Sequence, residues 1–297
     1  MNRLTSLVIA ASLALGIGAV GARAQQAPKV EVQALRGSLH LLQGGGGNVV
    51  ASVGFDGILL IDDDYPQYAP AYEEAIAKLA GAGLAPGFVV NTHWHGDHTG
   101  NNEYWGNRGA IIFGHNNVRK RMSSGQRIEA LDMQVEPSPA MALPMVTYGD
   151  SLALHFNGND IEVQHYPAGH TDGDSVIYYA QDNVVHTGDL FFRDAFPFID
   201  LSSGGSVAGY IANVEAVLAR LDDDTLVVPG HGALAGKADL QRFLDMLKQT
   251  TASIHGALDA GKSVDQVIAA GLGEQWRSWG TGFIDEAAWI RTVAAGR

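Results

Sequence analysis

The first half of the chain alternates short apolar runs with turns rich in glycine. Apolar runs of this length, bounded by turn residues, are typical of buried strands, and they predict strands at residues 39–43, 48–53 and 57–62. The first two strands are joined by Gly44–Gly47, a hairpin connection whose four glycines predict a mobile tip. An amphipathic helix is predicted over residues 69–79, because glycines follow it and stop it.

The second half begins near Met145 and has strands and helices of its own. Residues 206–221 carry apolar side chains at helical intervals, which predicts an amphipathic helix against the core, and further helices are predicted from about residue 238 onward. No repeat period or low-complexity linker divides the chain, so one domain is predicted over residues 25–297. Strands in this half are predicted at residues 151–156, 161–165, 175–179, 184–186 and 225–229.

Residues 1–24 have the pattern of a secretory signal peptide. A basic start is followed by an apolar run over residues 7–20 and by the small-residue cleavage sequence Ala22-Arg23-Ala24. The pattern predicts a mature chain from Gln25 and a periplasmic or secreted protein. Because the apolar run is short and no later segment approaches about 20 uninterrupted apolar residues, no stable membrane span is predicted.

Composition narrows the class of protein. Hydrophobic residues make up 46% of the chain, which is enough to build one sizeable core. The formal charge of −13 becomes −15 when Arg3 and Arg23 leave with the signal peptide, and so acidic a surface repels nucleic acid. The absence of cysteine disfavours a structural zinc knuckle, which generally relies on thiolates.

The segment Thr92–His98 places three imidazoles and a carboxylate within seven residues. Residues 87–91 before it predict a short buried strand, so the cluster lies where a strand ends. In an extended segment alternate side chains share a face, which predicts that His93, His95 and Asp97 converge while His98 leaves at another angle. Imidazole nitrogens and carboxylate oxygens suit zinc, and the chemistry that this predicts is activation of water.

Three later segments repeat the same arrangement of a ligand beside glycine after a predicted strand. They are Gly169-His170-Thr171, Thr187-Gly188-Asp189 and Gly230-His231-Gly232. In this order, after His-x-His-x-Asp-His, they resemble the metallo-β-lactamase superfamily over essentially the whole mature sequence. The resemblance implies an α/β (α+β) protein, an αββα sandwich of two mixed β-sheets with helices on the outer faces.

The resemblance also implies a ligand set for two zinc ions per chain. His93, His95 and His170 would hold the first ion, and Asp97, His98 and His231 the second, with Asp189 bridging both. The zinc ions would lower the pKa of a bound water toward about 7 for attack on a carbonyl group. Asp97 would act catalytically by orienting that nucleophile.

Departures from the family pattern leave several substrates open. Classical zinc β-lactamases carry cysteine where this chain has Asp189, so the ligand set looks more like glyoxalase II and the lactonases, whereas residues 169–172 and the export signal look like β-lactamases. Glyoxalase II needs clustered basic residues in its C-terminal region, and this tail has none clustered. Persulfide dioxygenases keep the histidines with a single iron, and a binding module that retains the site is a further alternative.

The segment that follows Asp189 contains two candidate substrate contacts, Phe192 and Arg193. Arg193 could anchor an anionic group, and Phe192 belongs to an aromatic loop over residues 191–199 that could form an apolar wall opposite the glycine hairpin. Ser202–Gly205 is interpreted as a loop and helix cap rather than a nucleophile. The sequence therefore predicts an exported binuclear zinc hydrolase that opens a small-molecule carbonyl substrate, a β-lactam, lactone or ester before a glutathione thioester.

Overall fold

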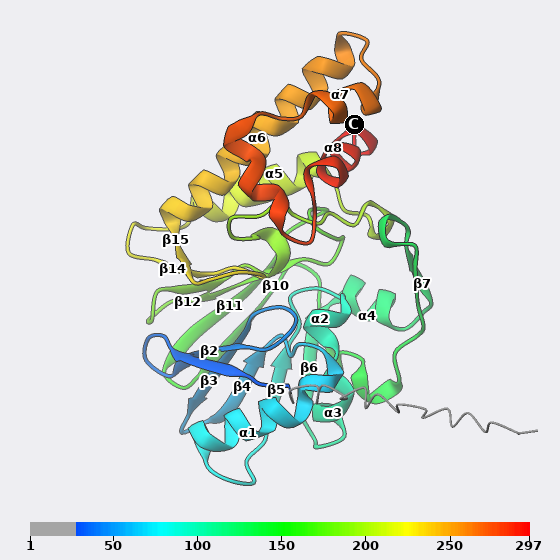
Figure 1. The fold of residues 1–297 in the computed structure, drawn as a ribbon. Coiled ribbons are helices and arrows are strands. Elements are labelled where there is room, and N and C mark those ends of the chain that lie inside the picture. The colour runs from blue at the N-terminus through cyan, green and yellow to red at the C-terminus, as the bar shows by residue number, and fades with distance from the viewer. Residues whose placement is uncertain (1–27) are drawn as a thin grey trace, which may run out of the picture.

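The computed structural model describes residues 28–297. The predicted signal peptide, residues 1–24, lies outside the described residues. In the described part, two β-sheets face each other and carry helices on their outer sides, the predicted αββα arrangement (Figure 1). None of the helices in residues 28–297 is both long enough and apolar enough to cross a membrane.

The first sheet is built from seven strands of the N-terminal half. Its first four strands pair antiparallel, and the remaining three continue parallel. The strands in spatial order are β1 (Glu31–Ala34), β2 (Leu39–Gln43), β3 (Val49–Gly54), β4 (Gly57–Ile61), β5 (Phe88–Val90), β6 (Ile111–His115) and β9 (Val146–Tyr148).

The second sheet is built from six strands, which pair antiparallel except for one parallel pair, β13 with β14. A separate two-stranded ribbon, β7 (Gln126–Ile128) with β8 (Met133–Val135), belongs to neither sheet. The strands of the second sheet are β10 (Ser151–Phe156), β11 (Asn159–His165), β12 (Ser175–Tyr179), β13 (Val184–His186), β14 (Leu226–Val228) and β15 (Ala235–Gly236).

Eight α-helices lie in the described part of the chain. Helix α1 covers the outer face of the first sheet, and α5, α6 and α8 cover the outer face of the second (Figure 1). The helices are α1 (Ala69–Ala80), α2 (Gly96–Thr99), α3 (Asn102–Gly106), α4 (Asn116–Met122), α5 (Val207–Leu218), α6 (Lys237–Asp259), α7 (Val264–Ala270) and α8 (Glu286–Ala295).

Three apolar layers hold this arrangement together. Between the sheets, side chains such as Leu41 and Val50 pack in one cluster with Val163 and Ile177 of the opposite sheet. Tyr72 and its neighbours on α1 form the layer under the first sheet. The largest layer lies between the second sheet and the C-terminal helices. Burial of apolar surface at about 25 cal/mol per Å² makes these layers the main source of stability.

The predicted strands and helices are found within one to three residues of their predicted ends, with two differences in organisation. Strand β9, just after Met145, still pairs with β6 in the first sheet, so the second sheet begins only at β10. Strands β1, β6, β7, β8, β9 and β15 were not predicted. All except β6 are short or exposed and lack the apolar run that marks a buried strand, whereas β6 has such a run, residues 111–113, that was overlooked.

Candidate metal centre

The clustered side chains gather at one edge of the two sheets. His93 follows β5 in a bend and His95 is in extended backbone, but Gly96 begins helix α2, so the chain turns before Asp97. The prediction that His93, His95 and Asp97 share one face was therefore wrong. The helical turn places Asp97 beside His98 and away from His93 and His95.

All seven predicted ligands meet in this place. Their potential ligand atoms form three overlapping groups, and within each group the atoms lie within 4.8 Å of one another. Five of the seven side chains are buried, while Asp97 and His231 face the cleft described below. The groups are His93 with His95 and His170, His93 with His98 and Asp189, and Asp97 with His98 and His231.

Asp189 lies between the other six ligands and directs one oxygen to each side. Its Oδ1 is 3.0 Å from His98 Nε2 and 3.4 Å from His231 Nε2. Its Oδ2 is 3.4 Å from His170 Nε2 and 3.9 Å from His93 Nε2. A carboxylate in this position can contact two separate ions at once.

Hydrogen bonds from the protein fix which nitrogen of each imidazole faces the centre. His170 Nδ1 donates to the carbonyl of Phe198 at 2.7 Å, and His95 Nε2 donates to Asp200 Oδ2 at 3.1 Å. His170 Nε2 and His95 Nδ1 are left facing each other at 2.8 Å. Two imidazole nitrogens held this close, with their other nitrogens engaged, are arranged to share a cation.

The carboxylate of Asp62 orients the imidazole of His98, as that of Asp200 orients His95. Asp62 Oδ2 accepts from His98 Nδ1 at 2.7 Å and from the Thr92 hydroxyl at 2.8 Å, while its Oδ1 accepts from the Thr92 amide at 2.7 Å. Asp62 is fully buried. It therefore ties the start of the ligand loop to the imidazole that ends it and leaves His98 Nε2 for the centre.

An unpartnered buried atom shows that a group fits here. Within residues 28–297, the His93 Nε2 atom is buried without a hydrogen-bond partner, although it points into the centre. An unpaired buried polar atom costs roughly 1–3 kcal/mol, so this nitrogen calls for a ligand. Imidazole nitrogens and carboxylate oxygens at these separations fit a borderline divalent metal ion.

The two sides of the centre differ in their affinity for protons. Burial lowers the pKa of His93 well below its usual value and that of His170 to about 4. Burial also acts against charge on His98 and His231, yet the surrounding carboxylates, Asp189 first, raise the pKa of His98 well above its usual value and that of His231 to about 9. Without metal, His98 and His231 therefore hold protons in the place where a metal ion would bind.

These shifts predict how the stability of chelator-treated protein depends on pH. Raised folded-state pKa values at His98 and His231 stabilise the fold below about 6.5, the usual histidine pKa, and this contribution is lost as pH rises toward 9. The lowered pKa of His170 acts in the opposite direction, because the unfolded chain takes up a proton as pH falls from about 6.5 to 4. The denaturant midpoint should peak near pH 6.5. A midpoint that rises steadily from pH 6 to pH 9 would contradict the prediction.

The glycine hairpin lies against the metal centre instead of extending as a free tip. Gly45 N–H donates to Asp64 Oδ2 at 2.9 Å, and Gly47 N–H donates to the Asp97 carbonyl at 3.1 Å. A Cβ atom on Gly47 would overlap the imidazole of His98. The glycines thus permit close approach of the backbone to the ligands, and the predicted mobile tip is tied at both ends.

We expect Gly47→Ala to expel His98 from its position. Overpacking at a filled site lowers the free energy of unfolding by about 1–3 kcal/mol. A displaced His98 could no longer bind the metal ion that it would share with Asp97 and His231. Gly96→Ala is the matched control, because a Cβ there meets nothing within 4 Å. Thermal denaturation and metal content would be compared between the two variants, and equal metal content in both would show that the hairpin does not constrain His98.

The two candidate substrate residues take different positions. Phe192 stacks on His231, with ring centroids 5.0 Å apart and an interplanar angle of 15°. Arg193 turns its guanidinium to the Leu234 carbonyl and to Asp239, at 3.4 Å. An anionic substrate group would have to compete with Asp239 for this cation.

Asp62 and Asp200 were missed by the sequence reasoning, although both had a local signal. Asp62 follows β4 directly, at a strand end beside the ligand loop. Asp200 precedes Ser202 and Ser203, whose hydroxyls donate to its two oxygens, so these serines support a ligand rather than act as nucleophiles. Residues 202–205 lead into α5, and the residue that caps this helix is Ser206, which accepts from the Gly209 amide at 3.2 Å.

Comparison with known proteins agrees with this geometry. The chain is 23% identical over 164 residues to a metallo-beta-lactamase type 2 of Bacteroides fragilis, which covers 54% of this chain and 59% of the relative. It is 29% identical over 163 residues to a hydroxyacylglutathione hydrolase of a Polaromonas species, which covers 54% of each. The chain therefore spans about half the length of these curated relatives.

A solved structure shows a likeness of fold, and a family model shows the family. The crystal structure of DIM-1 metallo-beta-lactamase matches with a TM-score of 0.59 at 17% identity, covering 74% of this chain and 98% of that one, a likeness of fold. The model of the metallo-beta-lactamase superfamily matches residues 40–231. Because that match spans more than half of the chain and includes all seven clustered side chains, the chain belongs to the metallo-beta-lactamase superfamily.

Proposed function

We propose that the chain is an exported hydrolase that holds two zinc ions and cleaves a small-molecule carbonyl substrate. The observation that carries this proposal is the position of Asp189, whose two oxygens face separate groups of imidazoles. One carboxylate between two ligand groups is the arrangement that two neighbouring ions require. Export rests on the signal-like sequence of residues 1–24.

The residues divide between the two ions as their spacing suggests. His93, His95 and His170 would hold one, and Asp97, His98 and His231 the other, with Asp189 shared. Bound zinc supplies Lewis acidity and lets water ionise near neutral pH. Within the protein, Asp97 keeps its charge, because His98 and His231 overcome the effect of burial and lower its pKa to about 2. It can therefore orient a water at the centre and accept its hydrogen bond.

The tail of the chain argues against glutathione as the recognised group. Of its basic side chains, Lys237, Arg242 and Lys248 pair with Asp223, Asp194 and Glu215 respectively. The carboxylates beside these three side chains would compete with a peptide carboxylate for them. A β-lactam, lactone or ester is therefore favoured over a glutathione thioester.

Metal content and a substrate panel test the proposal. Protein purified without chelator should contain close to two zinc ions per chain. It should hydrolyse a chromogenic cephalosporin, an acyl lactone or an aryl ester better than S-lactoylglutathione. One iron per chain with oxygen uptake on a persulfide would assign the protein to the dioxygenases, and a hundredfold preference for the thioester would assign it to the glyoxalase II type.

A further inference from the structure

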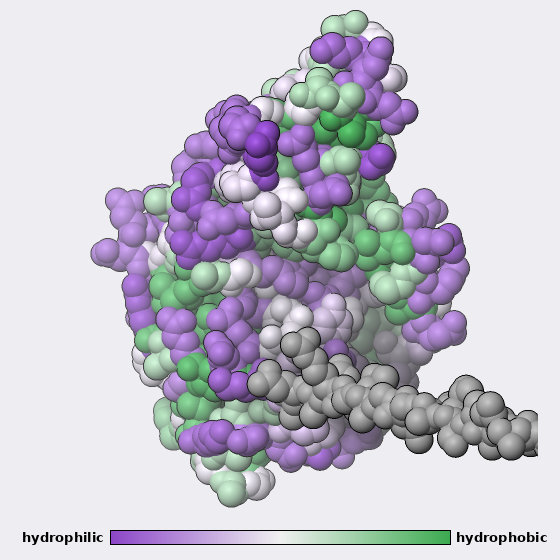
Figure 2. Space-filling model, viewed as in Figure 1, coloured by the Kyte–Doolittle hydropathy of each residue, from purple (hydrophilic) through white to green (hydrophobic). Residues whose placement is uncertain are grey.

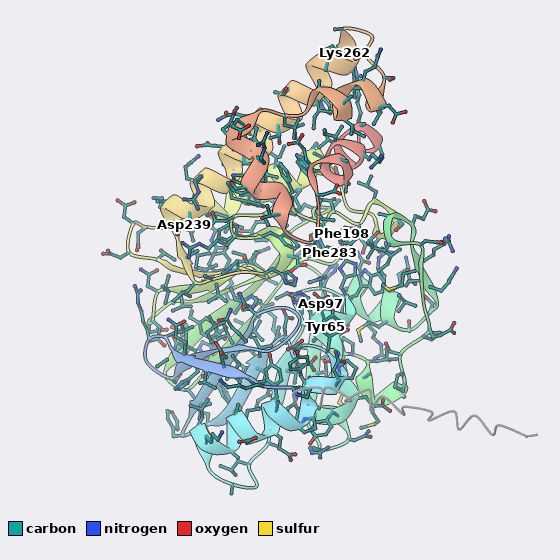
Figure 3. All side chains as sticks on the ribbon, viewed as in Figure 1. Tyr65, Asp97, Phe198, Asp239, Lys262 and Phe283 are labelled. Atoms are coloured by element: carbon teal, nitrogen blue, oxygen red, sulfur yellow. The ribbon has the colours of Figure 1, made fainter. Side chains whose placement is uncertain are left out.

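A large apolar cleft opens directly onto the metal centre. Its volume is about 920 Å³, and Asp97, Asp189 and His231 lie in its lining. A space of this size accommodates a drug-sized molecule. In Figure 3, Phe198 and Phe283 lie together on one side of the centre, and Asp97 and Tyr65 lie opposite them.

The walls of the cleft come from two parts of the chain that are distant in sequence. One wall is the β7–β8 ribbon, where Leu131 and Met133 remain 39% and 42% exposed. The other is the segment before α8, where Phe283 remains 71% exposed. Figure 2 shows apolar residues gathered below the C-terminal helices, on the side where Figure 1 places the β7–β8 ribbon.

A series of aromatic contacts leads from the ligands to the mouth of the cleft. The Phe198 ring lies 5.8 Å from the rings of His95 and His170. Phe283 packs edge-on against Phe198, with ring centroids 6.2 Å apart at 82°. The Phe196 amide bonds to the Trp279 carbonyl at 3.0 Å, which attaches the C-terminal segment to the aromatic loop. Phe283 itself contacts Phe198 through its ring edge, while 71% of its surface is free.

The charges of the cleft disfavour an anionic substrate. Two carboxylates of the lining, Asp97 and Asp189, belong to the metal centre. Away from that centre, and within residues 28–297, the charged lining consists of one carboxylate, Glu136, and one lysine or arginine, Arg193. The Arg193 guanidinium is already held by the Leu234 carbonyl and by Asp239. A substrate carboxylate away from the metal centre would therefore find repulsion and no free cation.

We propose that this cleft selects a neutral ester or lactone with an apolar chain, which lies between Phe283 and the β7–β8 ribbon while its carbonyl lies at the metal centre. The inference rests on the proposed hydrolase function and narrows it, because it places β-lactams with a free carboxylate behind neutral substrates. Phe283, Leu131 and Met133 are then specificity-determining residues. Phe283 lies outside the part of the chain that the family model matches.

A chain-length series of para-nitrophenyl esters, from acetate through butyrate and hexanoate to octanoate, tests this directly. Complete burial of a methylene is worth about 0.8 kcal/mol, or up to about fourfold, so kcat/KM should rise about two- to fourfold for each added methylene. Octanoate should exceed a chromogenic cephalosporin at least about tenfold. Equal kcat/KM for acetate and octanoate, or faster turnover of the cephalosporin, would overturn the proposal.

Matched variants separate the cleft from general effects of losing surface apolar groups. Phe283→Ala should lower kcat/KM for octanoate by about fivefold and leave acetate unchanged, as expected for loss of part of one apolar contact. Phe55→Ala is the control, because Phe55 is 87% exposed in the β3–β4 turn and lies outside the cleft lining. An equal loss for all chain lengths in Phe283→Ala would contradict the assignment.

A binding measurement keeps this inference separate from the proposed hydrolysis. Calorimetry with octanamide and acetamide on the zinc-treated protein should show binding of octanamide only, weakened in Phe283→Ala and unchanged in Phe55→Ala. If no ester, lactone or cephalosporin is hydrolysed, the proposed function fails while octanamide binding still supports an apolar site. If esters are hydrolysed but octanamide does not bind, the apolar site is wrong and the hydrolase remains.

Discussion

Asp189→Ala should release metal from both ligand groups and lower kcat/KM by about a thousandfold or more. Its two oxygens face His98 and His231 on one side and His93 and His170 on the other, so one substitution removes a ligand from both. Metal ions supply several kcal/mol of transition-state stabilisation, which corresponds to at least that factor in rate. The positive charge of the remaining site would also lose its compensating carboxylate.

Metal stoichiometry and kcat/KM would be measured at the same zinc supply for the wild type, Asp189→Ala and a control, Asp245→Ala. Asp245 is exposed on α6, and within residues 28–297 its side chain bonds only to Gln241, so its removal should change neither quantity. Asp189→Cys should keep about one zinc ion, because a thiolate binds zinc well but offers a single ligand atom. Two metals and full activity in Asp189→Ala would show that this carboxylate does not bridge.

The ligands could be predicted from the sequence because their chemistry is concentrated in short segments. Three histidines within Thr92–His98 have no ordinary structural explanation, and the later ligands each stand beside glycine at a strand end. Spacing alone, however, gave the wrong neighbours for Asp97. Period-two reasoning assumes extended backbone, and helix α2 begins at Gly96, inside the motif.

The residues that orient the ligands were hidden because their role depends on contacts across the fold. Asp62 reaches His98 over 36 positions, and Asp200 reaches His95 over 105. Their local signals, a strand end before Asp62 and two serines after Asp200, do not by themselves say which ligand either residue contacts. The cleft walls were hidden for a different reason. The β7–β8 ribbon has strands of three residues, and Phe283 enters the cleft from a C-terminal segment that the predicted helices did not place.

Asp62→Asn should destabilise the metal-free protein, in which His98 is protonated, by about 3–5 kcal/mol and should lower metal affinity by 10- to 100-fold. The first figure is the usual cost of breaking a buried charged pair by removing one partner, and the second is the usual effect of losing a carboxylate that orients a metal-binding histidine. Asparagine keeps the shape of the side chain and tolerates the left-handed backbone of residue 62, where φ is 61°. The loss of charge is therefore the main change, because His98 Nδ1 and the two Thr92 donors would meet a neutral amide.

The matched control is Asp194→Asn, which makes the same substitution in the same backbone region, with φ 58°, at an exposed position. Urea denaturation and zinc titration with a competing chelator would be run on both variants and on the wild type. Asp194→Asn should stay within about 0.5 kcal/mol of the wild type, as is usual for surface substitutions. If Asp62→Asn also stays within that range and keeps its zinc affinity, the charge of Asp62 does not hold His98 in place. The orientation of that imidazole would then come from packing alone, with Gly47 and the ring of His93, whose centroid lies 4.3 Å from that of His98, as its nearest constraints.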